Sequence, residues 1–525
     1  MSADSHSSTH IMDITSVHAW FTIAVVSIIV TIATKVARAR AVSLARRRTH
    51  QPSVAKGAPL VGVLPAILTN SLQDVICQQY SKLGSVFTLK SFGVQVTFLV
   101  GPEVSAHFFH GTESEISVAD TYKITVPITG KGVGFDADND TRNQQQRFFA
   151  EYLRPAKLRT HVLPMEYFAK WGQCGAVDLK HEVDNVLMLM ASRCLLGKEV
   201  REHTHDEVCS FMLELIDGLN IVSMFFPYLP TPAHRRRDRA RARLDEIFSG
   251  ITRARRRSGR ATGDDDDMLQ ALIDSRYKDG RSTTDGEVTG LLVALLFFGH
   301  HTSSTVATWT AARLLRHAEW LRAVEAEQKR LVTTTSWTAA RLLRHAEWLR
   351  AAEEEQKRLV TTTRHFIDYD VVQRMDVLHR CIKEALRLHP VTPMILRRAS
   401  RAFTVRTAAG DEYGVPEGRM LASPLVVNNL LPGIYRDPHA FDPDRFGPGR
   451  EEDRAGGDLA NTSFGAGRHA CMGEGYAYLQ IKVILSHLLR NFELELASPF
   501  PATENMITMR PKGEVMVKYK RRLLH

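Results

Sequence analysis

The residues with the clearest chemical potential lie near the end of the chain, in the segment SFGAGRHACMGEGYAYLQIK at 463–482. Phe464, Gly467, Cys471 and Gly473 fit the pattern F-x-x-G-x-x-x-C-x-G. Glycines let backbone N–H groups approach a sulfur atom, and the positive end of a helix that starts just afterwards stabilises a thiolate. These are the requirements of a cysteine that binds haem iron. The alternative is a buried structural cysteine, against which the four fixed positions argue together.

A second set of residues carries opposite charges. Glu384 and Arg387 stand three residues apart, so they lie on one face of a predicted helix. The segment FDPDRF at 441–446 follows and contains Arg445. An E-x-x-R pair alone is a weak signal because exposed pairs of opposite charge are common. Its position before FDPDRF and the cysteine segment makes the three segments together a strong signal.

The third segment is FFGHHTSST at 297–305, which follows an apolar run that begins at Gly290. Adjacent helical residues point about 100° apart, so His300 and His301 cannot easily bind one metal ion from the same helix face. A proton relay and a polar patch in a buried helix remain as interpretations.

In these three segments the chain resembles the cytochrome P-450 family. His301 followed by Thr302 and two serines resembles its sterol 14α-demethylase branch, as does TYKITVPITGKGVGFD at 121–136, which resembles the cover of the sterol cavity there. The resemblance implies a mainly α fold with small β-sheets, and haem b held by Cys471. It also implies removal of the 14α-methyl group of a sterol precursor such as lanosterol or eburicol in three oxygenations. These would use O2 and electrons that NADPH–cytochrome P-450 reductase takes from NADPH.

The resemblance assigns a role to each matching residue. Thr302 would bind oxygen, and His301 would deliver protons or, alternatively, pair with a surface carboxylate as a gate. Glu384, Arg387 and Arg445 would hold the fold together. The residues expected at the haem, besides Cys471, are Tyr122, Arg397, Phe464, Gly465, Arg468 and His469. Those expected at the sterol are Ile124, Phe135, Ala294, Phe297, Phe298, Met394, Leu396 and Met509. For Met394, Leu396 and Met509, packing in the core is an equal alternative.

The chain departs from the family pattern at several positions. Phe298 stands where the family has Ala or Gly, so its ring is expected to narrow the space for oxygen and substrate. Phe135 replaces a Tyr, and His300 replaces a Gln. Ile124 favours a sterol with two methyl groups at C4. Another membrane monooxygenase, acting on fatty acids or terpenoids, and a catalytically impaired haem- or sterol-binding protein remain as alternatives.

The N-terminus predicts a membrane anchor. Residues 18–34 contain AWFTIAVVSIIVTIAT, which has no formal charge and approaches the length that spans a bilayer. Lys and Arg follow this segment and none precedes it, which places the later residues in the cytosol. We expect a lumenal segment at 1–17, an endoplasmic reticulum anchor at 18–34, a linker at 35–66, and one catalytic domain at 67–525.

Composition limits the partners. The 68 Lys and Arg residues exceed the 58 Asp and Glu residues by 10, and the excess is clustered. Such clusters can face anionic lipid, an acidic protein or nucleic acid, and nucleic acid is the weakest candidate because no zinc finger or aromatic RNA-binding motif accompanies them. Arg468 and Lys482 are plausible reductase contacts. Six scattered cysteines without a C-x-x-C pair indicate a reducing compartment.

An internal repeat interrupts the helical part of the sequence. Residues 309–335 recur at 337–363 with differences only at Val324/Ala352 and Ala326/Glu354. Each copy has an amphipathic stripe followed by three threonines, so we expect the extra copy to form a surface helix pair. Alternation predicts a hairpin over 85–101, and short strands are expected over 403–415 and 506–519.

Overall fold

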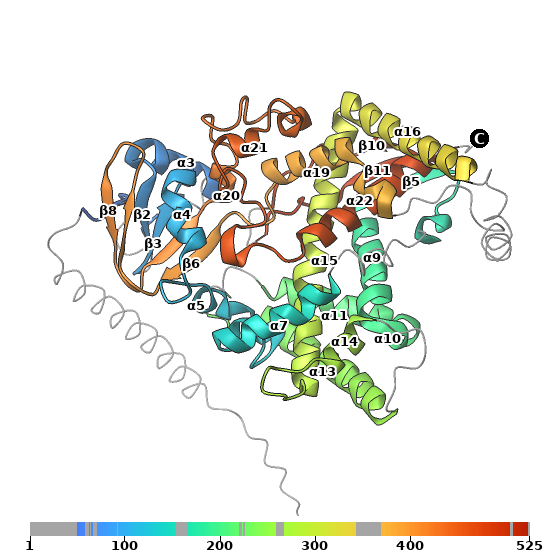
Figure 1. The fold of residues 1–525 in the computed structure, drawn as a ribbon, viewed down its shortest axis with the longest axis horizontal. Coiled ribbons are helices and arrows are strands. Elements are labelled where there is room, and N and C mark those ends of the chain that lie inside the picture. The colour runs from blue at the N-terminus through green and yellow to red at the C-terminus, as the bar shows by residue number, and fades with distance from the viewer. Residues whose placement is uncertain are drawn as a thin grey trace, which may run out of the picture.

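The computed structural model describes residues 50–57, 62–63, 65–66, 71–91, 93–153, 166–219, 223, 226–258, 267–342, 369–504 and 508–522. The predicted segments 1–17 and 18–34, and residues 343–363 of the second repeat copy, lie outside this part. Figure 1 shows the strand-rich region at one end of the molecule and most of the helices at the other. The fold is therefore mainly α with small β-sheets, as predicted.

The largest sheet has six strands in the order β1-β2-β3-β9-β6-β4. Its strands are β1 (Ser53–Val54), β2 (Val86–Ser91), β3 (Val94–Leu99), β4 (Ile116–Ser117), β6 (Ile395–Ala399) and β9 (Met420–Ser423). The antiparallel pair β2–β3 confirms the predicted hairpin. β1 pairs with β2, and the Ala55 N–H donates to Thr88 O at 2.9 Å. Ser53–Val54, within the expected linker 35–66, thus belongs to this sheet.

Two smaller sheets accompany it. β10 (Phe492–Leu496), β11 (Met516–Arg521) and β5 (Cys174–Asp178) form one, and β7 (Phe403–Arg406) with β8 (Glu412–Val415) forms the other. The β7–β8 pair confirms the strands predicted over 403–415. The strand predicted over 506–519 forms only from Met516. β5 pairs with the distant β11, and its first three residues are exposed.

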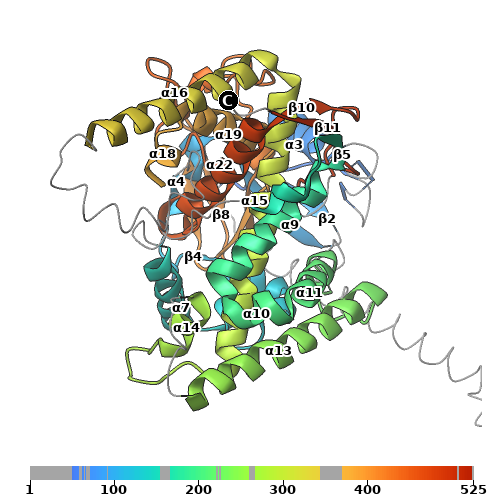
Figure 2. The same ribbon diagram turned by 90° about the vertical axis from the view of Figure 1, so that its right-hand side faces the viewer.

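The helix α15 (Asp285–Arg316) runs through the middle of the molecule (Figures 1 and 2). Thr284 and Glu287 form a capping box that fixes its start. A Cβ atom on Gly290 would lie 2.4 Å from Thr129 O, so glycine permits close packing there. α15 is long and apolar enough to span a membrane, but most of it is buried inside the protein, and we interpret it as a core helix.

α15 packs against α9 (Leu179–Ala191), α13 (Pro232–Ser258), α19 (Asp376–Leu388) and α22 (Glu474–Asn491). The other α-helices are α3 (Leu72–Leu83), α4 (Pro102–His110), α5 (Ala119–Tyr122), α6 (Val126–Thr129), α7 (Asn139–Tyr152), α10 (Gly197–His203), α11 (His205–Asp217), α14 (Met268–Asp274), α16 (Ala318–Leu342), α18 (Tyr369–Gln373), α20 (Leu425–Asn428) and α21 (Glu452–Ala455). Short 3₁₀ turns include η1 (Lys123–Thr125), η2 (Gly134–Asp136), η6 (Pro443–Phe446) and η7 (Gly467–His469).

The predicted surface helix pair lies partly outside the described residues, and the start of the second copy is helical. α16 continues through Thr333–Thr335 and into the second copy as far as Leu342. The three threonines thus do not end the helix, because their lower helix propensity costs only a few tenths of a kcal/mol each, roughly. The first copy supplies the end of α15 and most of α16.

Candidate active site

The cysteine segment folds into a tight turn against α4. Gly465 and Gly467 have φ values of 73° and 64°, which glycine adopts without strain. A Cβ atom on Gly467 would lie 2.2 Å from Phe109 O, so no other residue fits there. The Cys471 N–H donates to Phe464 O at 2.8 Å, and α22 begins three residues after Cys471. The predicted glycine turn, cysteine and following helix are all present.

The Cys471 side chain is exposed to open space, although protein surrounds it. Burial raises the pKa of the thiol, a hydrogen bond from the Gly473 N–H opposes this, and the nearby Glu474 carboxylate raises the pKa further. The thiol is therefore open to a ligand although the surrounding protein desolvates it. The neighbouring Met472 is also exposed, at 44%.

Two buried arginines test whether haem fits this site. Arg397 on β6 is 4% exposed and Arg142 on α7 is 3% exposed. Within the described ranges, Arg397 Nε and Arg142 Nη1 have no hydrogen-bond partner. Burial also lowers the pKa of Arg397, and the nearby Tyr122 and Glu113 partly offset this decrease. A buried guanidinium with an unpaired N–H is costly, so an anionic group is expected there. The two carboxylates of haem supply one, and the residues present therefore fit haem.

The residues on α15 point to different surroundings. Thr302 Oγ1 donates to Phe298 O at 2.7 Å, and its side chain remains partly exposed. His301 Nε2 lies 3.1 Å from Thr508 Oγ1, whereas His300 Nε2 lies 2.9 Å from the Asp184 carbonyl on α9. The two histidines bind different partners, in line with their exclusion as a metal pair.

Burial, with the positive charge of Arg510, lowers the pKa of His301 to about 4. The imidazole is therefore neutral at pH 7. His301 lines a small cavity of about 40 Å³ together with Lys180, Asp184, Asp217, His300 and Arg510. A cavity of this size holds water, which gives His301 a polar route towards solvent. The alternative role for His301 is a gate paired with a surface carboxylate. In the structure His301 instead hydrogen-bonds the Thr508 hydroxyl, which does not match this alternative.

Three aromatic residues form one continuous wall. The Tyr122 and Phe135 rings are stacked with centroids 5.1 Å apart, and the Phe135 and Phe298 rings meet edge to face at 6.5 Å. They come from α5, η2 and α15, which are distant in sequence. Phe298 is 43% exposed in the middle of a core helix, so its ring borders open space.

The other residues predicted at the sterol fall into separate groups. Met509 is buried, and Met394 and Leu396 are half-buried against the same apolar cluster beside the large sheet. Phe297 is buried in a different cluster, with side chains of α11 and α13, and Ala294 is also buried. Ile124 is half-buried in η1. The structure thus brings Phe135 and Phe298 together and places Phe297 in the core.

Glu384, Arg387 and Arg445 form one buried network. Arg387 Nε donates to Glu384 Oε2 at 2.7 Å, Arg445 Nε donates to Glu384 Oε1 at 3.0 Å, and all three side chains are 0% exposed. Arg387 also donates to the carbonyls of Asn429 and Pro438. The network joins α19 to the segment before the cysteine turn.

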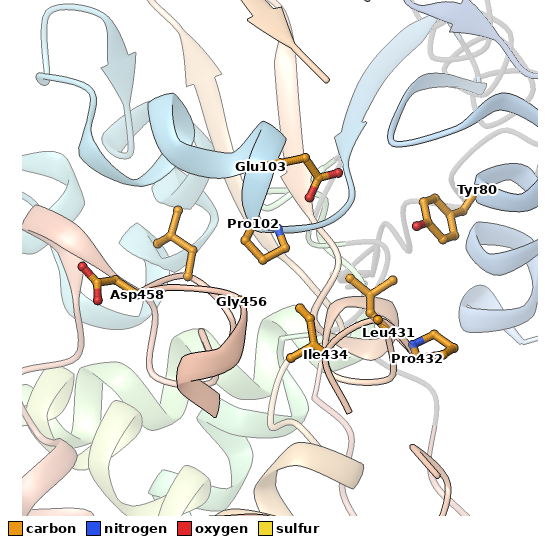
Figure 3. A pocket seen from close by; sticks show the side chains of 10 residues that line it. Tyr80, Pro102, Glu103, Leu431, Pro432, Ile434, Gly456 and Asp458 are labelled. Carbon is orange, nitrogen blue, oxygen red and sulfur yellow. The ribbon is translucent and has the colours of Figure 1, made fainter. Parts of the chain in front are cut away.

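The two predicted reductase contacts differ in exposure, and a groove lies away from the predicted site. Lys482 is buried in α22, and its Nζ donates to Val372 O at 3.2 Å, so its prediction as a reductase contact is wrong. Arg468, by contrast, is exposed. A surface groove of about 520 Å³ lies between α3, α4 and the segment at 431–434 (Figure 3), but none of the predicted site residues lines it.

Sequence reasoning missed Glu113 and Arg142. Glu113 Oε1 accepts from Arg142 Nη2 at 3.0 Å, and its Oε2 lies 3.1 Å from His469 Nε2. Both residues stand outside the motifs, as single charges in a loop and a helix, and only the fold brings them to His469.

Comparisons with known proteins agree with this architecture. The family model for cytochrome P450 matches residues 52–334 and 331–519, two ranges that meet inside the repeat. An obtusifoliol 14-alpha demethylase of Sorghum bicolor is 50% identical over 90% of this chain and 91% of its own length. A sterol 14-demethylase of Arabidopsis thaliana is 45% identical over 91% and 93%. The lanosterol 14-alpha demethylase of Homo sapiens is 32% identical over 84% and 81%.

The fold has a solved counterpart. The retinoic-acid-bound cyanobacterial CYP120A1 superposes with a TM-score of 0.73 over 91% of this chain and all of that chain, at 20% identity. This likeness concerns the fold alone, whereas the sequence relatives cover most of both chains. The chain belongs to the cytochrome P450 family, in its sterol 14-demethylase branch.

Proposed function

We propose that the protein removes the 14α-methyl group of a sterol precursor as a haem-thiolate monooxygenase. The observation that carries this proposal is Cys471, an exposed thiol in the glycine turn immediately before α22. The relatives named as sterol 14-demethylases support the choice of reaction.

Haem bound at Cys471 supplies the activation of O2 with electrons from a reductase. The protein residues hold and prepare the reactants. Cys471 would ligate the haem iron, and the unpaired N–H groups of Arg397 and Arg142 would bind the haem carboxylates. Tyr122, His469 and Arg468 are further candidates there, and Phe464 and Gly465 shape the turn.

Proton delivery is proposed for two residues of α15. The Thr302 hydroxyl is partly exposed, and it would hydrogen-bond oxygen during the reaction. His301, neutral at pH 7, accepts protons from the small polar cavity and passes them towards Thr302. Three successive oxygenations convert the methyl group to an alcohol, an aldehyde and finally formate.

The sterol lies against an apolar surface. Phe135 and Phe298 form one wall, and Ile124, Met394, Leu396 and Met509 are proposed to line the rest. Two relatives named as obtusifoliol demethylases are 47% and 50% identical, and the animal relatives named as lanosterol demethylases are 31–34% identical. We therefore propose obtusifoliol, which has one methyl group at C4, as the preferred sterol. This replaces the expectation of two C4 methyl groups that Ile124 suggested.

The cellular setting is also a proposal. Residues 18–34 would anchor the protein in the endoplasmic reticulum membrane with 35–525 in the cytosol, because the flanking positive charges lie only on the later side. Electrons would come from NADPH–cytochrome P-450 reductase, with the exposed Arg468 as one contact.

The ligand assignment is tested by the reduced carbon monoxide difference spectrum. We expect the red-shifted Soret band of a thiolate-bound haem in the wild type and its loss in Cys471→Ser. Cys174→Ser, an exposed cysteine in β5, is the matched control and should keep the band. A band that persists in Cys471→Ser would refute the assignment.

Reconstitution with reductase and NADPH tests the reaction. Obtusifoliol should release one formate per molecule converted, with a higher kcat/KM than lanosterol. Formate release from lanosterol at a higher kcat/KM would restore the expectation drawn from Ile124. Turnover of fatty acids or terpenoids without any sterol turnover would overturn the proposed function.

A further inference from the structure

Glu113 lies at the centre of a group of positive charges beside the cysteine turn. Its carboxylate accepts from Arg142 Nη2 on α7 at 3.0 Å and lies 3.1 Å from His469 Nε2 in the cysteine turn. It also accepts from the Val118 N–H at 3.3 Å. One side chain in the loop between α4 and β4 thus fixes groups from two distant parts of the chain and the backbone of the nearby Val118.

The charges of this group do not balance. Burial raises the pKa of Glu113, but the bonds from His469 and Arg142 outweigh this effect and lower it, so Glu113 is ionised at neutral pH. This single negative charge faces Arg142 directly and acts at longer range on Arg397. Arg142 Nη1 and Arg397 Nε nevertheless keep N–H groups that are buried and unpaired within the described residues. Most buried N–H groups in folded proteins are paired, so these two favour a further anionic partner at this place.

We propose that Glu113 is a positioning residue for haem. It holds Arg142 and His469 so that their remaining N–H groups, with those of Arg397, bind the two carboxylates of haem. Arg142 is accordingly a further haem-binding residue that sequence analysis did not identify. This inference rests on the proposed haem site at Cys471.

Two effects of Glu113 on haem binding have opposite signs. As a negative charge, Glu113 repels the haem carboxylates, so its removal would strengthen haem binding. As a positioning group, it orders two cations, so its removal would weaken haem binding. Since hydrogen bonds to charged groups act at short range and depend on geometry, while the repulsion between charges that are not in contact falls with distance, we expect the positioning effect to dominate.

The test measures the rate at which haem leaves the protein for excess apomyoglobin. Glu113→Gln removes the charge and keeps the side-chain length, and Glu113→Asp keeps the charge and shortens the reach. Glu115→Gln is the matched control, because Glu115 lies in the same loop and its carboxylate binds Thr112 instead. We expect about tenfold faster haem loss in both Glu113 variants, because this is the effect of losing one hydrogen bond to a charged group. We expect no change in the rate for Glu115→Gln.

The same measurement with haem dimethyl ester separates positioning from general stability. The ester has no free carboxylates, so the Glu113 variants should lose it at the wild-type rate. Equal acceleration for haem and its ester would show a merely structural role and overturn the proposal. Slower haem loss in Glu113→Gln would identify Glu113 as a competing anion and overturn it as well. Failure of the haem site itself is distinguishable, because the wild type would then show no thiolate band with carbon monoxide.

Discussion

At the scale of single residues, Phe297 and Phe298 show how α15 divides its side chains between core and site. Phe297 is 8% exposed among residues of α11 and α13, whereas Phe298 is 43% exposed beside Phe135. Their rings are nearly perpendicular, with centroids 5.3 Å apart. The family resemblance implies a small residue at position 298, so this ring is expected to narrow the space beside it.

Removal of the Phe298 ring should therefore improve sterol binding. Phe298→Ala is expected to strengthen the sterol-induced Soret shift several-fold, because the site gains volume. It should cost no more than about 1 kcal/mol of stability, because nearly half of the ring is already exposed. Phe297→Ala, the matched control, should cost roughly 3–5 kcal/mol through a core cavity without widening the sterol site. Weaker sterol binding in Phe298→Ala would instead show that the ring contacts the sterol productively.

At the scale of elements, the first copy of the repeat provides specific contacts that hold the haem-side helices. The Trp309 ring stacks on His389 with centroids 3.7 Å apart, and Glu327 accepts from the N–H groups of Val377 and Leu378 at the start of α19. Val324 is 0% exposed in the core. Glu327 thus supplies the cap that α19, the helix of the Glu384 network, lacks at Met375.

Two deletions test which copy the fold needs. Removal of 336–363 and removal of 309–336 give chains of equal length that differ only at the positions of Val324 and Ala326, which become Ala and Glu in the second case. Both chains restore one copy. The Ala326 position is exposed, so its change should matter little, whereas valine-to-alanine at a buried position should cost roughly 1–3 kcal/mol.

The deletion of 336–363 should therefore retain full haem content and a thermal midpoint at least equal to that of the complete chain. The deletion of 309–336 should also bind haem but unfold a few degrees lower. Haem loss after deletion of 336–363 alone would contradict this assignment, since it would show that the second copy is required.

At the scale of the whole molecule, local patterns predicted the site better than they predicted the sheets. The glycine turn with Cys471 and the spacing of Glu384 and Arg387 are short-range features, and the fold preserves them. β4 and β5 were missed because each is short and gains its hydrogen bonds from strands more than 250 residues away. Glu113 and Arg142 were missed for the same reason, since their partners are set by tertiary packing rather than by spacing.

The buried histidines predict how the whole molecule responds to acid. Burial, chiefly, lowers the pKa of His301, His379 and His487 to about 4, and it lowers the pKa of His389 well below its usual value. The unfolded chain protonates these groups near pH 6.5, about the value of a free imidazole, so it binds more protons than the folded chain below that pH. The contribution of these histidines to the free energy of unfolding should therefore be constant above about pH 6.5 and fall as the pH drops towards 4.

Urea unfolding midpoints at pH 7.5, 6.5, 5.5 and 4.5 check this prediction. The fold lowers the pKa of carboxylates such as Glu113 and Glu287, so their protonation weakens the fold only below about pH 4.5, the ordinary pKa of a free glutamate. The decrease in the unfolding midpoint between pH 6.5 and 5 therefore belongs to the histidines. His379, whose ring packs on Tyr478, gives a direct control. His379→Gln should make the unfolding midpoint fall less steeply with decreasing pH, by the contribution of one proton, because glutamine does not titrate. A midpoint that stays constant from pH 7.5 to 5, or an unchanged slope in His379→Gln, would show that these imidazoles are accessible to protons in the folded protein.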